Sequence, residues 1–96
     1  MCYILSVRFE WDPRKAQLNQ RKHQVTFAEA AECFADSLAM LLNDPVHDNR
    51  LILIGQSRSH RLIFTVYAEK HPHIIRIISA RRATRTERNA YEEGDF

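Results

Sequence analysis

The sequence predicts an α+β fold with a small antiparallel β-sheet meander, two helices before the sheet and one helix after it, in a single domain of residues 1–96. Three observations favour this fold. A chain of this length buries one modest core. Thr-x-x-Glu signatures mark two helix starts. The apolar runs of the second half are separated by turns too short for a parallel crossover, so neighbouring strands should be antiparallel. We expect the helices to cover one face of the sheet and leave part of the other open.

The first quarter of the chain predicts a strand followed by a basic helix. Residues 2–11 have the β-branched and aromatic character of a strand, which stops at Asp12-Pro13. Aspartate caps helices and proline favours their first turn, so a helix is expected over residues 13–22. This helix carries several cations and few apolar residues, and it should pack lightly over an edge of the sheet.

A second helix should belong to the core. Thr26 and Glu29 have the spacing of a capping box, and Asp36-Ser37 should end the helix. Between these limits the apolar residues follow the i, i+3, i+4, i+7 pattern of a buried stripe: Phe27, Ala30, Ala31 and Phe34.

The rest of the chain predicts strands and a final helix. The apolar runs lie at residues 38–42, 50–54, 61–69 and 74–81, with Leu62, Phe64 and Val66 on one face of the third run. Thr84 and Glu87 form another capping box, so a helix should follow the last strand.

Composition limits the class of protein. The net charge is only +2, so a basic surface would depend on where the cations lie. The two cysteines give no disulfide framework and the N-terminus does not resemble an export signal, which favours a reducing, cytoplasmic location. No apolar run reaches the ~18 residues of a membrane span. The two glycines build no phosphate-binding loop, so no nucleotide cofactor is expected.

The strongest local signal is a cluster of arginines around the end of the last strand. Residues 76–88 contain five arginines and one acid, Glu87. The cluster precedes a helix N-terminus, whose dipole favours anions. A phosphate of RNA or DNA is the expected ligand. The arginines are Arg76, Arg81, Arg82, Arg85 and Arg88.

Several segments, in order, also resemble the BrnT toxins of bacterial type II toxin–antitoxin systems, which have a RelE-like ribonuclease fold. The resemblance covers nearly the whole chain after residue 8. It is carried by Phe9-Glu10-Trp11-Asp12-Pro13 with Lys15, Arg21-Lys22-His23 before residues 25–30, Ile54-Gly55-Gln56-Ser57, residues 76–84, and Tyr91-Glu92-Glu93.

This resemblance implies a toxin that cleaves RNA and stops translation. It also implies a cognate BrnA-like antitoxin, which forms a hetero-oligomer with the toxin. The complex would contact operator DNA only through the antitoxin. Metal-independent cleavage would need a base for the 2′-hydroxyl, cations for the phosphorane and an acid for the leaving oxygen.

Strand alternation separates the two adjacent arginines. Regular pleating places Arg82 on one face with Arg76, and Arg81 on the other face with Ser79. One arginine of the pair is expected to contact substrate and to assist catalysis, while the other braces the structure. In the alternative interpretation, Arg81 pairs with a carboxylate such as that of Glu10 or Glu87.

His23 is the candidate for proton transfer, because imidazole exchanges protons near neutral pH, and Lys22 and Arg76 are candidates for binding substrate phosphate. The alternative for His23 is a role at the helix C-terminus. Tyr67 and Tyr91 could stack on bases, although packing in the core or at its edge is the competing interpretation. The remaining histidines have no metal-ligand spacing, so no metal is expected.

The combined hypothesis is a cytoplasmic, metal-independent endoribonuclease toxin that attacks through the 2′-hydroxyl, with Arg81 or Arg82, Lys22 and His23 at its site. The alternative hypothesis is a non-catalytic module of the same fold, which binds nucleic acid or acts with an antitoxin as a corepressor subunit.

Overall fold

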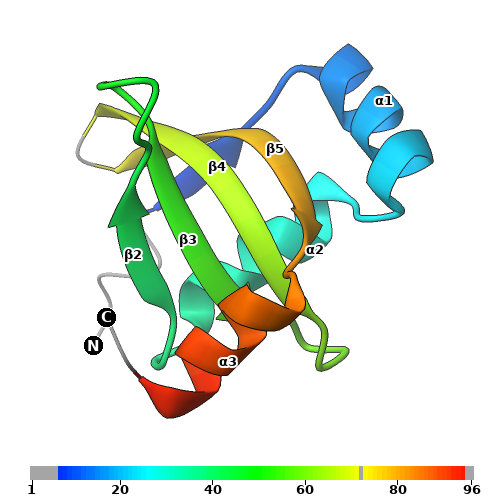
Figure 1. Cartoon of the computed structure of the whole chain (residues 1–96). Coiled ribbons are helices and arrows are strands. Elements are labelled where there is room, and N and C mark those ends of the chain that lie inside the picture. The colour runs from blue at the N-terminus through cyan, green and yellow to red at the C-terminus, as the bar shows by residue number, and fades with distance from the viewer. Residues whose placement is uncertain (1–6, 72, 95–96) are drawn as a thin grey trace.

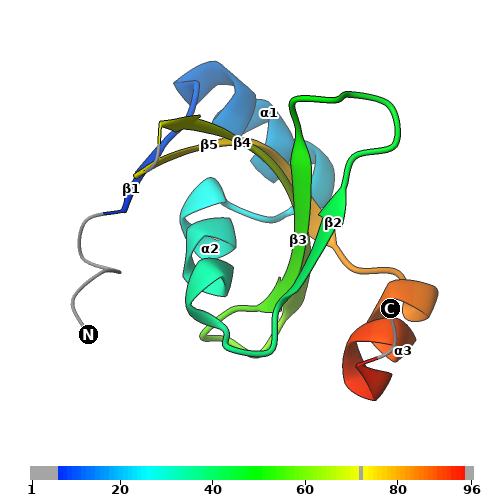
Figure 2. The same ribbon diagram turned by 90° about the vertical axis from the view of Figure 1, so that its left-hand side faces the viewer.

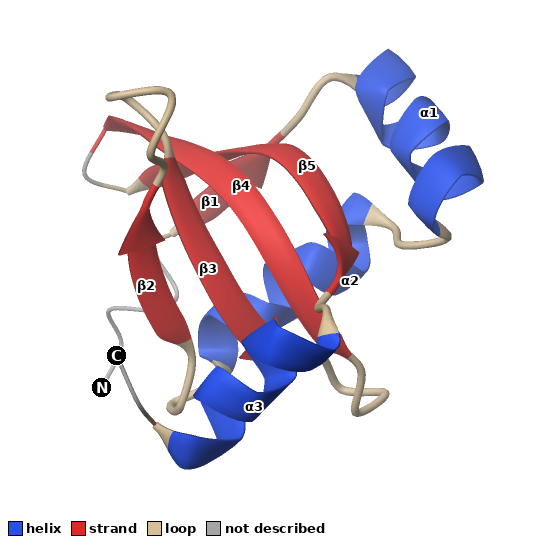
Figure 3. Cartoon of the chain, in the orientation of Figure 1, coloured by secondary structure: helices blue, strands red, loops and turns tan. Residues whose placement is uncertain are grey.

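The computed structural model describes residues 7–71 and 73–94, which form a five-stranded mixed sheet and three α-helices (Figures 1 and 3). The strands follow the spatial order β1-β5-β4-β3-β2. In chain order the elements are β1 (Arg8–Glu10), α1 (Pro13–His23), α2 (Phe27–Glu32), a short 3₁₀ helix η2 (Cys33–Ala35), β2 (Met40–Asn43), β3 (Leu51–Gln56), β4 (Leu62–His71), β5 (Ile74–Arg82) and α3 (Arg85–Glu93).

The predicted elements are confirmed in type and order, but the sheet is not purely antiparallel. Strands β2 to β5 form the expected meander, whereas β1 pairs in parallel with Ile74–Arg76 at the start of β5. The prediction was wrong here because the rule on short turns applies only to consecutive strands. Residues 2–6 of the strand predicted over residues 2–11 lie outside the part that the structure describes.

The helices do not lie on one face as expected. Helix α2 packs on one face of the sheet and α3 on the other, as the edge-on view in Figure 2 shows. The sequence of β3, Leu51–Gln56, explains this, because its leucines and isoleucines form a continuous apolar run that needs cover on both faces. Within the described residues, no helix is long and apolar enough to cross a membrane.

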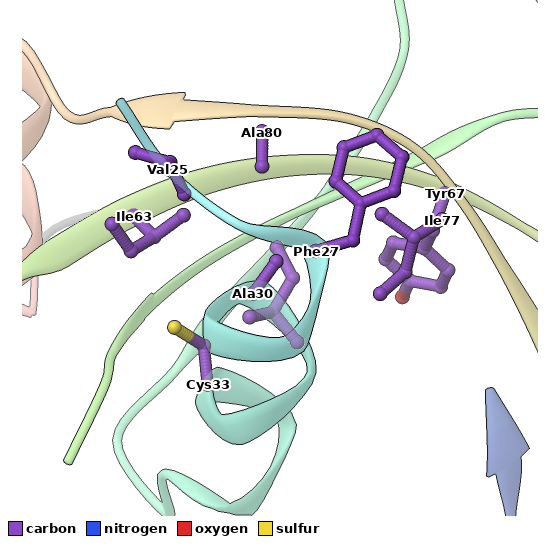
Figure 4. Packing of buried hydrophobic residues seen from close by; sticks show 9 residues of the cluster. Val25, Phe27, Ala30, Cys33, Ile63, Tyr67, Ile77 and Ala80 are labelled. Carbon is purple, nitrogen blue, oxygen red and sulfur yellow. The ribbon is translucent and has the colours of Figure 1, made fainter. Parts of the chain in front are cut away.

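The main core lies between α2 and the sheet (Figure 4). Phe27 and Ala30 of the predicted stripe are fully buried, and Ala31 and Phe34 pack around them. Aromatic rings join the layers edge to face, with ring centroids 5.9 Å apart for Trp11 and Phe27. A smaller cluster on the opposite face contains Ile52, Ile54 and Leu62, with Phe64, Val66 and Tyr91 packed against it.

Two of the predicted helix caps are confirmed and one is only half formed. Asp12 caps α1, and Thr84 and Glu87 form a complete capping box. The Thr26 hydroxyl accepts from the Glu29 N–H at 3.0 Å. The Glu29 carboxylate, however, turns away and binds Arg61, which lies just before β4, together with the hydroxyls of Ser57 and Ser59 in the β3–β4 turn. A charged partner thus outcompetes the local cap.

This network predicts a specific acid sensitivity. Hydrogen bonds led by that from Arg61 lower the pKa of Glu29 from 4.5 to about 2. Because the folded pKa is depressed, the stabilisation is complete above pH 4.5 and is lost as the pH falls toward 2. Urea unfolding across this window should show a smaller loss of stability for Glu29→Gln than for the parent. Parallel losses in the two proteins would contradict this role of Glu29.

An irregularity in β5 changes the faces of its side chains. Val66 pairs with Ser79 while the next residue, Tyr67, pairs with Ile77, so Ile78 is an extra residue in β5. This β-bulge reverses the alternation beyond it. Arg76 therefore shares a face with Arg81, and the prediction that it shares one with Arg82 was wrong.

Candidate functional site

Helix α1 is fixed to the free edge of β5 by one buried side chain. The Asn19 amide donates to the carbonyl of Ala80 at 2.8 Å and accepts from the Ala80 N–H at 3.1 Å. It also donates to the Val25 carbonyl at 3.0 Å. β1 covers only the start of β5, so Asn19 takes the place of a neighbouring strand for the second half.

This attachment creates a groove of about 230 Å³ between α1 and the bulge of β5. The α1 residues in it have the spacing of one helix face. From α1 the groove is lined by Lys15, Leu18, Asn19, Lys22 and His23, and from β5 by Ile78 and Ser79. The structure thus brings together the predicted His23 and Lys22, and places beside them a hydroxyl, that of Ser79.

The groove is electropositive because of α1. Helix α1 contains four Lys or Arg residues and no acid. Lys15 and Lys22 are exposed, and the ion pairs recorded among the described residues include neither of them. The half-buried His23 lies in the last turn of the helix, which is the position that the alternative C-terminal role requires, and it also lines the groove.

The predicted arginine cluster is partly neutralised. Arg76 pairs with Glu10 at 3.1 Å. Arg81 makes two hydrogen bonds to Glu87, each 2.9 Å long, and lies 3.9 Å from the centroid of the Phe64 ring. Arg81 is therefore paired with a carboxylate, that of Glu87, as the alternative interpretation of this residue predicted. Arg82 and Arg85 are exposed.

We expect the two adjacent arginines to differ under substitution. Arg81→Ala should lower the free energy of unfolding by about 1–3 kcal/mol, since it removes charge-assisted hydrogen bonds that hold the start of α3. Arg82→Ala should leave stability within about 0.5 kcal/mol and weaken RNA binding. Chemical unfolding and RNA titration of both variants measure the two effects. Equal losses of stability would contradict the assignment.

Neither predicted tyrosine lies in the groove. Tyr67 is 4% exposed and packs edge to face on Phe34, with centroids 4.9 Å apart, so its ring has no free face for a base. The Tyr91 hydroxyl donates to Asp36 at 2.6 Å and ties α3 to the loop after η2. Burial, followed by this hydrogen bond, raises the pKa of Tyr91 to about 12. Packing is the observed role of both.

Within the described part of the chain, the remaining reactive side chains show neither an accessible thiol nor a metal-ligand cluster. Cys33 is fully buried, and burial raises the pKa of its thiol to about 12. Across residues 7–71 and 73–94, no three His, Cys, Asp or Glu side chains gather as metal ligands would.

Sequence reasoning missed Lys15, Leu18 and Asn19 as groove residues. The available signal was the polar Asn19 three residues after Ala16, on the side of α1 that faces inward. A polar residue at an inward position requires a hydrogen-bonding partner.

The basic groove suits a polyanion such as RNA, and comparisons with known proteins define the class as a ribonuclease toxin. The family model described as the ribonuclease toxin BrnT of a type II toxin–antitoxin system matches residues 11–87. The 1.1 Å crystal structure of the Brucella abortus ribonuclease toxin BrnT is similar, with a TM-score of 0.66, 25% identity, and coverage of 82% of this chain and 99% of that one. No curated protein matches. The chain belongs to the BrnT family of ribonuclease toxins.

Proposed function

We propose that this protein is an endoribonuclease toxin that cleaves RNA in the groove between α1 and β5. The observation that carries the proposal is the convergence of Lys15, Lys22 and His23 on one groove beside the bulge of β5. The two ammonium groups supply cations for a phosphate, and the imidazole supplies a group for proton transfer. β-Bulges are frequent beside active sites.

The proposed reaction is attack of a ribose 2′-hydroxyl on the adjacent phosphate, as in RelE-like ribonucleases. The attack forms a 2′,3′-cyclic phosphate and breaks the bond between phosphorus and the 5′-oxygen of the next nucleotide. The 2′-hydroxyl loses a proton and the leaving 5′-oxygen gains one; His23 makes one of these two transfers and water makes the other. Lys22 and Lys15 stabilise the negative charge of the phosphorane. No metal takes part in this scheme, because the lysines supply the positive charge. Arg82 extends the contact along the RNA backbone, while Arg81 acts indirectly by holding the start of α3.

Cleavage of RNA explains how such a toxin inhibits translation, and the family implies a cognate antitoxin that holds it inactive. We propose that an acidic or amphipathic segment of a BrnA-like antitoxin covers the basic surface of α1 and that any operator contact is made by the antitoxin.

The test is cleavage of RNA by the purified protein in excess EDTA, together with growth after its induction in bacteria without antitoxin. The proposal predicts growth arrest, and RNA fragments ending in 2′,3′-cyclic phosphate whose yield does not depend on metal. An abundant, folded protein that neither arrests growth nor cuts RNA would support the corepressor alternative. Cleavage abolished by EDTA and restored by a divalent cation would overturn the metal-independent scheme.

A further inference from the structure

The groove contains an apolar residue that proton transfer and phosphate binding do not use. Leu18 is 62% exposed at the centre of the α1 face of the groove, and Ile78 of the β5 bulge lies in the opposite wall. We propose that Leu18 and Ile78 form a subsite for one base of the RNA, next to the phosphate held by the lysines. This inference rests on the proposed function.

The spacing of the charges around Leu18 fits a single strand. Lys15 lies three residues before Leu18 and Lys22 four residues after it, so all three share one face of α1. The seven-residue step from Lys15 to Lys22 spans about 10 Å along the helix axis. A base that packs on Leu18 would thus have Lys15 on one side and Lys22 on the other, each near a flanking phosphate. Sites for single-stranded nucleic acid combine apolar contacts to bases with cations along the backbone in this way.

Comparison with the other exposed apolar residues supports a polyanionic ligand at Leu18. Leu38, Leu41 and Val46 are 66–78% exposed and lie in or near β2, at the opposite side of the sheet from α1. Residues 36–49, which contain them, include three aspartates and no Lys or Arg. RNA would be repelled there, whereas the groove at Leu18 combines apolar contact with positive charge.

Leu41 provides a matched control, because it is 66% exposed, close to the value for Leu18. The experiment uses fluorescence anisotropy to measure binding of a fluorescein-labelled single-stranded RNA that the protein cleaves. Every protein in this comparison carries His23→Ala, which slows cleavage. We expect Leu18→Ala to weaken binding about 3- to 10-fold and Leu41→Ala to leave it unchanged.

A series of RNAs with one abasic nucleotide at successive positions identifies the base. At one position the abasic RNA should bind more weakly than intact RNA to the protein with Leu18 present. With that abasic RNA, Leu18→Ala should cause no additional loss of affinity. Equal loss from Leu18→Ala with every abasic RNA, or no loss with intact RNA, would overturn the base subsite. Normal RNA binding combined with weaker antitoxin binding would assign Leu18 to the antitoxin instead.

A cleavage assay of the parent with His23 intact, run beside these binding measurements, separates this inference from the proposed function. If the parent with His23 intact cuts RNA and Lys22→Ala weakens RNA binding while Leu18→Ala does not, only the base subsite fails. If the parent does not cut RNA, the proposed function fails, whatever the binding result.

Discussion

Replacing His23 with alanine is expected to slow RNA cleavage by about 10²-fold or more, because a positioned group that transfers a proton contributes roughly 10²–10⁴-fold to the rate. RNA affinity should change little, since the lysines of the groove supply the phosphate contacts. The measurement is single-turnover cleavage with enzyme in excess, which separates chemistry from binding. The parent and the variant should produce fragments with the same ends if residual cleavage occurs.

His47→Ala is the matched control, because His47 is an exposed histidine in the loop between β2 and β3, away from the groove. It should cleave at the parental rate. A His23→Ala protein that is folded and cleaves RNA as fast as the parent would remove His23 from the chemistry and leave only its position at the end of α1.

Asn19→Ala should cause the largest loss of stability of any single change in α1, about 2–4 kcal/mol in the free energy of unfolding. The substitution leaves the N–H and carbonyl of Ala80 and the carbonyl of Val25 without their partner. Buried polar groups without partners cost about 1–3 kcal/mol each, and partial entry of water reduces the sum. Urea unfolding monitored by circular dichroism measures the change.

Asn19→Ala should also disturb the geometry of the groove, because α1 would no longer be hydrogen-bonded to β5. Under conditions in which both proteins are folded, Asn19→Ala should therefore cleave RNA more slowly than the parent. Gln20→Ala, an exposed neighbour on the same helix, should change stability by less than about 0.5 kcal/mol and leave cleavage intact. Equal stability of the Asn19 and Gln20 variants would contradict the role of Asn19 as the link between α1 and β5.

Local signals predicted the elements of this fold well. Asp12 before Pro13 located the start of α1, and Thr84 with Glu87 located the start of α3, because capping depends on residues only a few positions apart. The antiparallel order from β2 to β5 followed from short turns. These features need no knowledge of the distant chain.

The features that the sequence did not predict depend on partners far away in the chain. β1 pairs with β5 across more than sixty residues, and Asn19 and Ala80 are 61 positions apart. Glu29 leaves its local cap for Arg61, 32 positions away. The bulge at Ile78 depends on the register with β4, so the faces of Arg76 and Arg81 could not be read from alternation alone.

The candidate site shows the same division. His23 and Lys22 were predicted from residue type and family resemblance, and they do line one groove. Arg81 was the more conspicuous candidate, but its guanidinium is paired with Glu87. The capping signature in the sequence assigned Glu87 to the cap of α3, and the same carboxylate performs both roles. The positive surface is therefore carried by α1 as well as by the end of β5.

The most direct test of the groove as the RNA site is the map of backbone amide shifts on titrating the protein with a single-stranded oligonucleotide that is 2′-deoxy throughout and so cannot be cut. The largest shifts are predicted for the groove face of α1, Lys15 to His23, and for Ile78 and Ser79 of β5. Shifts concentrated instead at the start of α3, or on the face of the sheet covered by α2, with α1 unchanged, would contradict this site.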